Sequence, residues 1–368
     1  MLKDHKSKPK VLIAALDWGL GHATRMIPMI NYFLQHNWEV SIASSSEAFH
    51  LLKTTFPHLK CFELPSYKAH YNMRSKALSM LFQLPKFRKA IQEEHQQTKN
   101  ILKEFKADLI ISDNRYGVYH ANITSIFITH QLQILPPKNL FFVAPVLYRL
   151  HQKMMKHFNQ IWVPDMEGNV NIGGKLSHHN NKSSKVKYVG PLSRFSHNLN
   201  SIPKSMSTEN PNILSWVSGP EPERSKFKNL LLDQLQNIAG NHILLSGLPS
   251  QPEVKTINNV TVYNHLNDDE FIKLVDSSDL IICRSGYSSI MDIYYLGKQA
   301  MLIPTPGQTE QEYLAKKHFE EGIFFTQSQS KLNIKLALSE ISIFKGFESI
   351  KNDNFNDLQN ILSNLGFV

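Results

Sequence analysis

The sequence has very little cysteine. Cys61 and Cys283 are the only two, and they lie outside any Cys-x-x-Cys or Cys/His spacing that holds zinc. A disulfide framework and a structural zinc are therefore not expected, and a reducing compartment is the simpler setting.

Long apolar runs are also missing. The lysine-rich start leads into an apolar stretch at residues 11–16, which is too short for a signal-peptide core. No stretch approaches the roughly 18 to 20 apolar residues that cross a bilayer. We therefore expect a cytoplasmic protein that is not integral to a membrane.

Length, composition and charge narrow the class further. A chain of 368 residues favours two domains, and 42% hydrophobic with 19% charged residues is typical of a globular protein. The net charge of +9 favours anionic partners such as phosphorylated metabolites, anionic lipid or nucleic acid. Because the basic residues are spread along the chain and form no known reading module, nucleic-acid binding is not expected.

Short apolar strands alternate with helical spacings in both halves. Strands are predicted at residues 10–16, 39–43, 108–112, 123–129 and 187–189, and again at 212–217, 242–246, 260–263, 280–283 and 300–303. A short phrase recurs, Ala-Asp-Leu-Ile-Ile at 107–111 and Ser-Asp-Leu-Ile-Ile at 278–282. The pattern predicts an α/β protein with two doubly wound, Rossmann-like domains that face each other across a cleft and bind ligands at the carboxyl ends of their strands.

The domain boundaries follow from composition. Residues 193–211 are rich in Ser, Asn and Pro and have no periodicity, which is typical of a linker. We expect an N-terminal domain over residues 1–195, a linker over 196–211 and a C-terminal domain over 212–345. A last helix within residues 346–368 can pack back on the first domain.

The second half contains the strongest local signal. A strand that ends at Cys283 leads through Arg284, Ser285 and Gly286 into a helix. Gly286 permits a close backbone approach, and the amides and positive end of the helix can then bind a diphosphate.

The helix that follows carries a candidate ribose ligand. At 100° per residue, Ser288, Asp292 and Tyr295 fall on the face away from the core. Asp292 stands one turn above Ser288, where its carboxylate can accept hydrogen bonds from ribose hydroxyls. The alternative is that Asp292 is a solvated surface acid.

Loops after neighbouring strands add polar groups. The loop at 304–313 contains Gln308, Gln311 and Glu312, which can read sugar hydroxyls, and residues 264–268 follow the strand at 260–263. Backbone groups there, around His265 and Leu266, can meet a uracil edge.

From about residue 263 to 315 the sequence resembles family 28 glycosyltransferases, the family that includes the enzyme that makes lipid II and enzymes that glycosylate diacylglycerol. The resemblance implies the GT-B architecture, a UDP-sugar donor and a hydroxyl acceptor, with a lipid-linked or cell-envelope acceptor among the possibilities. It implies that Asp292 replaces a ribose-binding glutamate and that the backbone of Leu266 meets uracil. The pair Gln311-Glu312 would read the donor sugar, and Arg194 would lie near the diphosphate.

The likeness is looser at the start of the second domain. The family often has a glycine-rich loop there, whereas residues 218–222 read Ser-Gly-Pro-Glu-Pro. Ser218 and Gly219 remain candidate phosphate contacts, although proline offers no amide donor. Ser218 and Glu221 also fit a helix capping box, which is the competing interpretation.

The matching turn of the first domain is the candidate acceptor side. Gly19 and Gly21 fail as a dinucleotide motif, because the third glycine and an acidic partner are missing. Residues 19–25, which include Arg25, do resemble the family's Gly-Gly-His acceptor loop. His22 could then take the proton from an acceptor hydroxyl, or it could merely orient the loop.

Asp113 is the rival base, because it follows a strand end on the same edge of the sheet, and Asp17 is a weaker third. A base with a pKa near neutrality is preferred, which favours His22.

The acceptor itself is weakly indicated. Residues 74–91 and 140–158 mix basic and apolar side chains, which fits either contact with an anionic membrane or helices that cover a core. We expect inverting transfer from a UDP-sugar without a metal, since no Asp-x-Asp signature stands at a strand end. A UDP-sugar 2-epimerase and a non-catalytic nucleotide-sugar sensor of the same fold are the alternatives.

Overall fold

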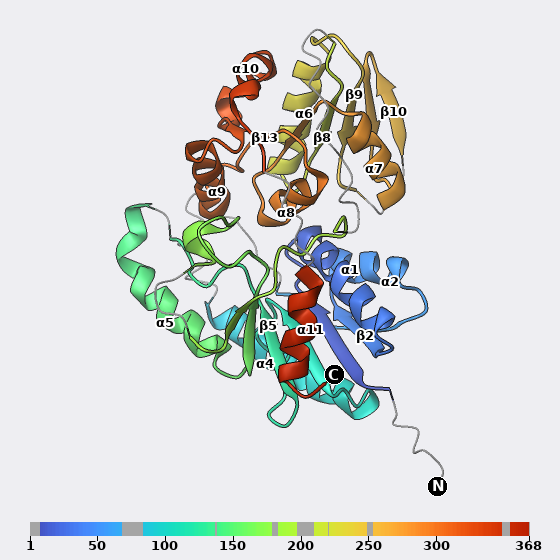
Figure 1. The fold of residues 1–368 in the computed structure, drawn as a ribbon, viewed down its shortest axis with the longest axis vertical. Helices are drawn as coiled ribbons and strands as arrows, with labels where there is room; N and C mark the ends of the chain where they lie inside the picture. The colour runs from blue at the N-terminus through green and yellow to red at the C-terminus, as the bar shows by residue number, and fades with distance from the viewer. Residues whose placement is uncertain are drawn as a thin grey trace. The chain divides into compact units, whose positions relative to one another are not determined.

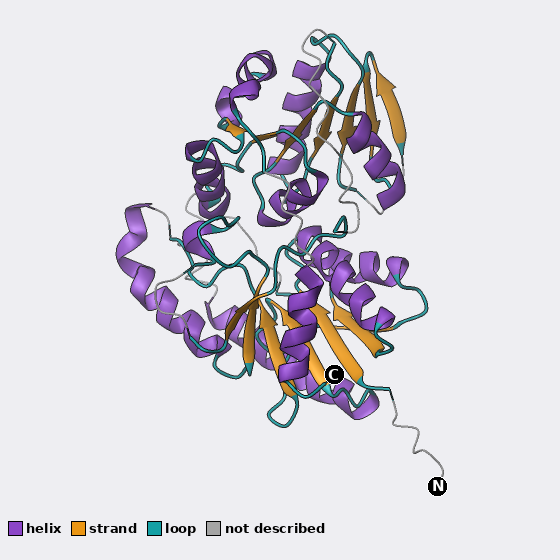
Figure 2. Ribbon diagram, viewed as in Figure 1, coloured by secondary structure: helices purple, strands orange, loops and turns teal. Residues whose placement is uncertain are grey.

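The computed structural model describes residues 8–67, 84–136, 138–178, 183–196, 210–219, 221–248, 253–347 and 354–367. The chain divides into two compact units, one formed by Met1–Arg194 with Asn352–Val368 and the other by Phe195–Lys351. Each unit is an α/β structure around one sheet (Figures 1 and 2). Most of the predicted linker, residues 197–209, and residues 74–83 of the predicted basic segment lie outside the described residues.

The sheet of the first unit is parallel throughout its described strands, in the order β3-β2-β1-β4-β5-β6-β7. The strands are β1 (Lys10–Ala15), β2 (Glu39–Ser44), β3 (Lys60–Glu63), β4 (Leu109–Asp113), β5 (Thr124–Ile128), β6 (Gln160–Val163) and β7 (Val186–Tyr188). The helices are α1 (Leu20–Gln35), α2 (Ser46–Thr55), α4 (Leu84–Glu104), η1 (Lys138–Val143), α5 (Ala144–Met155), η2 (Gly174–Leu176) and α11 (Asn354–Asn364).

Alternate side chains of β1 show why this sheet needs helices on both faces. Val11 and Ile13 pack in one core with α1, α2 and α11, while Leu12 and Ala14 pack in a second core with α4. Successive side chains of a strand point to opposite faces, so a continuous apolar strand must be covered twice.

The sheet of the second unit has the order β10-β11-β9-β8-β12-β13-β14. Only the β10–β11 pair is antiparallel among the described pairings. Its strands are β8 (Ile213–Trp216), β9 (His242–Leu245), β10 (Val254–Ile257), β11 (Val260–Tyr263), β12 (Leu280–Cys283), β13 (Ala300–Leu302) and β14 (Phe325–Thr326). Its helices are α6 (Glu223–Leu235), α7 (Asp268–Ser277), α8 (Tyr287–Leu296), α9 (Thr309–Glu320), η3 (Gln329–Lys331), α10 (Ile334–Glu340) and η4 (Ile341–Ile343).

The repeated phrase of the sequence occupies the same place in both sheets. Asp108 precedes β4 and accepts a hydrogen bond from the backbone amide of Lys10 at 2.8 Å. Asp279 precedes β12 and accepts one from the amide of Asn212, also at 2.8 Å. In each unit this aspartate ties the start of the first strand to the strand that pairs beside it.

The predicted α/β architecture is confirmed, but four strands were not predicted: β3, β6, β10 and β14. They are two to four residues long, and β10 is exposed at every position. Strands this short carry too little alternation to be recognised, and three of the four, β3, β10 and β14, lie at sheet edges. None of the helices that the structure describes combines the length and apolar character needed to cross a membrane.

Helix α11 returns from the second unit to complete the first. Leu358 and Leu362 are 1% exposed and lie in the core that contains β1, α1 and α2. Phe367 packs against Trp38 with ring centroids 5.4 Å apart. Figure 1 shows α11 crossing in front of the first unit's strands.

We therefore predict that Leu362→Ala destabilises the first unit by about 2–5 kcal/mol, the usual cost of truncating a buried leucine. Urea unfolding followed by tryptophan fluorescence measures this loss. The exposed neighbour Gln359 supplies the control, since Gln359→Ala is expected to change stability by less than about 0.5 kcal/mol. Equal losses in the two variants would show that α11 is not part of the cooperative core.

Candidate functional site

The acceptor-side turn lies between β1 and α1. Gly19 is the N-cap of α1 and has φ of 90°, a conformation that side-chain-bearing residues avoid. No acidic residue stands in the first turn of α1, so the positive end of the helix is uncompensated there. Gly21 and His22 lie in this first turn, half-buried at the carboxyl edge of the sheet.

His22 is held by two buried residues. Its Nδ1 lies 3.0 Å from Oδ2 of Asp113, which ends β4, and 2.9 Å from Nη2 of Arg25. Arg25 also donates from Nε to Asp113 Oδ2 at 2.9 Å and from Nη2 to Asp113 Oδ1. In the tautomer whose Nδ1 proton is donated to Asp113, Arg25 makes no hydrogen bond to Nδ1, and Nε2 keeps the lone pair that a general base needs.

The electrostatics separate the roles of these groups. Burial alone would raise the pKa of Asp113, but Arg25 and His22 overcome it and lower that pKa to about 2. Burial lowers the pKa of His22, which Asp113 partly offsets and Arg25 reinforces. His22 is therefore a neutral imidazole at physiological pH, facing a permanent carboxylate.

This geometry bears on two residues that the sequence singled out. Asp113 is fully buried, whereas the His22 side chain retains 16% exposure. The exposed imidazole is therefore better placed than the Asp113 carboxylate to meet a hydroxyl. Arg25, in the loop that was predicted to face the acceptor, is 1% exposed, and its guanidinium contacts Asp113 and Nδ1 of His130.

His130 and Asp17 complete this edge. His130 follows β5, is 6% exposed and lies 3.1 Å from Arg25 Nη1, a contact that the sequence did not predict. Its position just after a strand was the available signal. Asp17 accepts hydrogen bonds from Ser46 at 3.2 Å and Ser66 at 2.5 Å, which ties the turn after β1 to those after β2 and β3.

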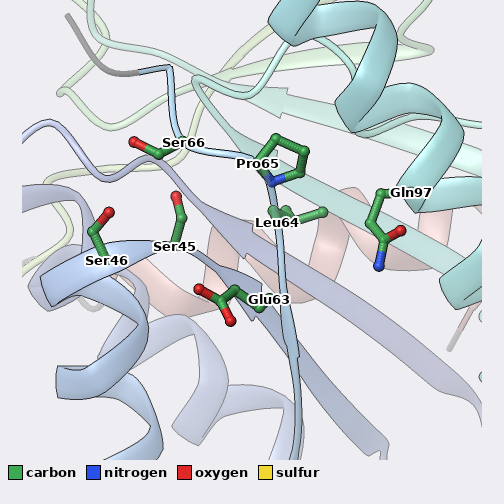
Figure 3. Close-up of a pocket in the computed structure, with 7 residues that line it drawn as sticks. All are labelled: Ser45, Ser46, Glu63, Leu64, Pro65, Ser66 and Gln97. Carbon is green, nitrogen blue, oxygen red and sulfur yellow. The ribbon is translucent and has the colours of Figure 1, made fainter.

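An open pocket lies at the same edge of the first unit (Figure 3). Its volume is about 500 Å³, and five of its seven lining residues are polar. The lining residues are Ser45, Ser46, Glu63, Leu64, Pro65, Ser66 and Gln97.

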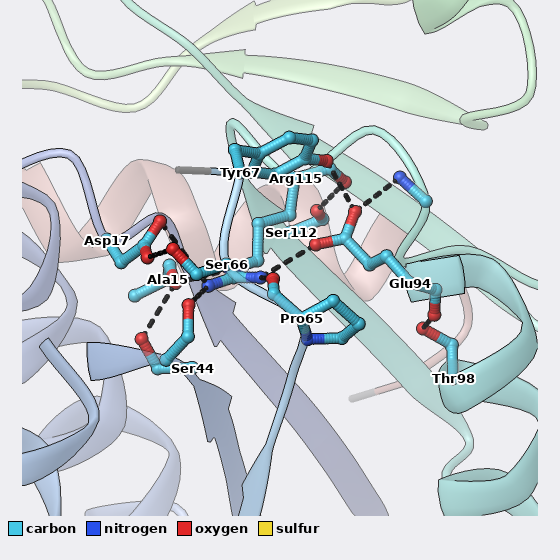
Figure 4. Close-up of polar contacts among 12 residues, drawn as sticks. Ala15, Asp17, Ser44, Pro65, Ser66, Tyr67, Glu94, Thr98, Ser112 and Arg115 are labelled. Carbon is cyan, nitrogen blue, oxygen red and sulfur yellow. Dashed lines mark hydrogen bonds and ion pairs between the residues drawn. The ribbon is translucent and has the colours of Figure 1, made fainter. Parts of the chain in front are cut away.

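A buried arginine fixes the wall of this pocket (Figure 4). Arg115 is fully buried and donates to the carbonyls of Ala15 at 2.6 Å and Pro65 at 3.2 Å, and to the hydroxyl of Ser45. Its charge is met by Glu94 Oε1 at 2.7 Å. Burial raises the pKa of Glu94, and Arg115 opposes that rise.

In the second unit, the predicted donor residues follow strands that run in one direction. The ends of β8, β11, β12 and β13 therefore share one edge of the sheet. Ser218 and Gly219 follow β8, and both are exposed. After β11, His265 is exposed and Leu266 is half-buried. Gln308 follows β13 and is half-buried.

Gly286 is the N-cap of α8, and neither a side-chain cap nor an acidic residue occupies the first turn. A Cβ at Gly286 would meet Nε2 of Gln311 at 3.8 Å, so that amide lies beside the turn. Ser285 is fully buried and donates its hydroxyl to the carbonyl of Gln311 at 2.8 Å. The head of α8 and the start of α9 are thereby held together.

The loop between β13 and α9 is closed by the same residues that were predicted to read the sugar. Gln311 Oε1 accepts from the Thr305 amide at 2.8 Å, and Glu312 Oε1 accepts from the Gly307 amide at 2.8 Å. Each side chain thus has one oxygen engaged in shaping the loop. The Nε2 of Gln311 faces Gly286, and Glu312 is exposed.

Asp292 is half-buried between two buried neighbours on α8, Met291 and Ile293. It is neither sealed in the core nor fully solvated, and Ser288 one turn earlier is half-buried as well. The prediction for Tyr295 was wrong, because Tyr295 is only 6% exposed. Its large ring packs edge-on against Tyr294 instead of facing solvent.

Arg284 requires a correction. It is fully buried, and its guanidinium donates to the carbonyls of Ile303, Pro304 and Glu223 and to Oε1 of Gln329, the last at 2.7 Å. The guanidinium carbon lies 3.9 Å from the ring centroid of Phe227. Burial lowers the pKa of Arg284 to about 10, so it stays cationic. Arg284 therefore positions the loops around the site and does not present its charge to a nucleotide.

Two other predictions concern the Ser218–Glu221 capping box and Arg194. The expected capping box of Ser218 with Glu221 is absent, because α6 begins at Glu223 and Glu221 instead accepts from the Ser225 amide at 3.2 Å. Arg194, the last residue of the first unit's main segment, is half-buried. Among the described residues no cluster of three His, Cys, Asp or Glu side chains could hold a metal ion.

Comparisons with known proteins bear on the fold and the family of this chain. Residues 233–341 match the sequence model of the glycosyltransferase family 28 C-terminal domain. An uncharacterized glycosyltransferase of Methanosarcina acetivorans is 25% identical over 333 residues, which cover 85% of this chain and 84% of that protein.

One further curated protein and one solved structure are also similar to this chain. Over 130 residues, or 30% of this chain and 37% of the relative, the chain is 26% identical to the UDP-N-acetylglucosamine--N-acetylmuramyl-(pentapeptide) pyrophosphoryl-undecaprenol N-acetylglucosamine transferase of Sulfurihydrogenibium. MurG from Acinetobacter baumannii shares the fold with a TM-score of 0.57 at 11% identity, over 98% of this chain and 100% of MurG. The family match and the curated relatives identify the chain as a glycosyltransferase related to family 28, and the likeness to MurG shows that its fold is GT-B.

Proposed function

We propose that this glycosyltransferase moves a hexose or N-acetylhexosamine from a UDP-sugar to an acceptor hydroxyl, with inversion. The observation that carries the proposal is the head of α8. There an uncapped helix start, free of acidic residues in its first turn, follows the end of a parallel strand, and a half-buried carboxylate stands in the second turn. A helix start of this kind favours a diphosphate, and Asp292 is suited to accept hydrogen bonds from the ribose.

The neighbouring loops would hold the rest of the donor. The backbone around His265 and Leu266, at the end of β11, is suited to a uracil edge. Gln308 and Gln311, with Glu312, would contact the sugar, because Nε2 of Gln311 already faces Gly286. Ser218 and Gly219 lie at the next strand end and would approach the phosphates.

The chemistry is a direct displacement. His22 Nε2 takes the proton of the acceptor hydroxyl while that oxygen attacks the anomeric carbon, and the bond from that carbon to the diphosphate oxygen breaks. The leaving UDP gains negative charge, which Arg194 and the amides at Ser285 and Gly286 would stabilise. Asp113 keeps His22 in the correct tautomer and stabilises the imidazolium that forms. We propose that no metal takes part.

Paired substitutions separate donor binding from chemistry. Asp292→Asn is expected to weaken UDP binding about tenfold in calorimetry, because a charge-assisted hydrogen bond to the ribose is lost. His22→Gln is expected to leave UDP binding unchanged and to lower turnover of UDP-sugar by about 10²-fold or more. Turnover is expected to persist in EDTA.

Control substitutions of the same residue types exist in the same two units. Asp276→Asn removes an exposed carboxylate near the C-terminal end of α7. His36→Gln removes the imidazole at the C-cap of α1, at the other end of that helix from His22. Both are expected to behave like the native protein. Unchanged UDP affinity in Asp292→Asn would remove the ribose assignment, and a new UDP-sugar formed without any acceptor would indicate an epimerase.

The pH profile of kcat/KM tests the His22–Asp113 pair. Since burial lowers the pKa of His22, turnover should stay high at neutral pH and fall only as the pH drops below the ordinary histidine value of about 6.5. Asp113 opposes that lowering, so Asp113→Asn should move the acid limb to still lower pH and reduce the maximal rate. A limb that moves to higher pH, or does not move, would contradict the assignment.

The acceptor side carries a surface suited to lipid. Phe141 and Phe142 in η1 are 73% and 66% exposed, and Val146 in α5 is 64% exposed. Arg149 and Lys153 are exposed on the same helical face as Val146, at spacings of three and seven residues. We propose that this surface rests on an anionic membrane at the cytoplasmic side and delivers a lipid-linked acceptor. The two free cysteines suit a reducing compartment.

Vesicle flotation tests this surface. The protein should bind phosphatidylcholine vesicles that contain phosphatidylglycerol, bind pure phosphatidylcholine less, and lose binding as salt rises. Phe141→Ser with Phe142→Ser should reduce binding about tenfold or more, because two exposed rings no longer enter the bilayer. Ile343→Ser, at a residue 72% exposed in the second unit, is the control. Equal binding by both variants would exclude this surface.

A further inference from the structure

The pocket of the first unit has a polar lining without a cation. Three of its seven lining residues are serines, Gln97 is an amide, Glu63 is a carboxylate, and none is Lys, Arg or His. A phosphate there would meet negative charge at Glu63 and no compensating side chain. Hydroxyl groups, which can donate to the carboxylate, the amide and the serine oxygens, fit this lining.

The buried charges next to the pocket do not make its net charge positive. Arg115 is fully buried and already engaged by Glu94 at 2.7 Å, with Asp17 Oδ1 at 3.9 Å. The start of α2 lines the pocket, but Glu47 in its first turn offsets the positive end of that helix. The pocket is therefore neutral to anionic, although the chain as a whole carries +9.

The pocket walls are fixed in advance. Arg115 donates to the hydroxyl of Ser45 and to the carbonyl of Pro65, while Ser46 donates to Asp17 Oδ2. Asp17 is 3% exposed, and its Oδ1 has no hydrogen-bond donor among the described residues. A rigid polar wall whose hydroxyl directions are set by buried charges favours a ligand with hydroxyls at defined positions.

An aromatic side chain stands next to this wall. Trp18 follows Asp17 directly and is 38% exposed. Its ring meets Tyr67, the residue after Ser66, edge-on with centroids 6.4 Å apart. The centroid of the same ring lies 5.8 Å from the ring centroid of Phe87, so Trp18 packs beside the pocket without lining it.

We propose that this pocket binds a neutral, hydroxyl-rich ring of the acceptor, such as a sugar or polyol headgroup, and disfavours a phosphate. The assignment rests on the proposed transferase function. Asp17, which organises the pocket, is five residues before His22 in the turn between β1 and α1, so both lie at the carboxyl edge of the same sheet. Gln97 donates to the ring hydroxyls, and Glu63 accepts from them.

Ligand-observed NMR titrations test the proposal with methyl α-D-glucopyranoside as the neutral probe and glucose 6-phosphate as the anionic one, both with UDP present. The neutral probe should bind with a millimolar Kd, and the phosphate several-fold more weakly. Gln97→Ala should weaken the neutral probe about fivefold, the loss expected for one hydrogen bond. Glu63→Gln should narrow the difference between the two probes, because the repelling charge is removed.

The matched control is Gln92→Ala, which removes an exposed amide from the same helix, α4, outside the pocket. It should bind both probes like the native protein. Tighter binding of glucose 6-phosphate, or neutral-probe binding that Gln97→Ala leaves unchanged, would overturn the pocket assignment. UDP affinity is measured in parallel. If UDP binds normally while the pocket test fails, only the pocket proposal is overturned. If UDP does not bind, the transferase proposal fails, whatever the pocket binds.

Discussion

A buried arginine next to the end of a central strand holds together the ligand-side loops of each unit. In the first unit Arg115, two residues after β4, ties the turns that follow β1, β2 and β3. In the second, Arg284, directly after β12, ties the loop after β13 to the start of α6 and to η3. A guanidinium taken out of water is tolerated only when its donors are used, so these loops are held in one arrangement. Breaking such a network typically costs about 3–5 kcal/mol.

The two arginines are neutralised differently. Glu94 pairs directly with Arg115, so the edge of the first unit shows no net positive charge behind its pocket. Arg284 instead donates mostly to carbonyl oxygens and lies over the face of Phe227, and the nearby Glu223 carboxylate acts on it without a direct ion pair. The uncapped helix start of α8 favours a diphosphate on the second unit, while a neutral acceptor ring suits the first.

Much of this could be predicted from the sequence, because strand ends and helix starts follow from local patterns. The alternation of strands and helices, the turn at Gly286 and the position of His22 at a strand-to-helix turn are all local features. The direction of a buried side chain is not local. Arg284 and Asp113 stand at strand ends, where ligand contacts are common, but the hydrogen-bond partners of their side chains lie 19 to 91 residues away in the chain. No pattern in a single sequence shows that His130 receives Arg25, or that Glu94 receives Arg115, since these pairings depend on how the strands are ordered in the sheet.

The first unit carries both the apolar surface on η1 and α5 and the polar pocket at Ser45 and Gln97. The apolar surface suits the lipid part of an acceptor, and the pocket suits a polar headgroup. A purely soluble sugar would not contact Phe141 and Phe142. A simple lipid alcohol would not supply hydroxyl donors to the serine oxygens of the pocket. A lipid that carries an uncharged hydroxyl-rich headgroup satisfies both surfaces. If the acceptor instead joined its lipid to its headgroup through a diphosphate, those phosphates would have to bind outside the pocket, and the uncompensated first turn of α1 beside Gly19 is the position in this unit best suited to them.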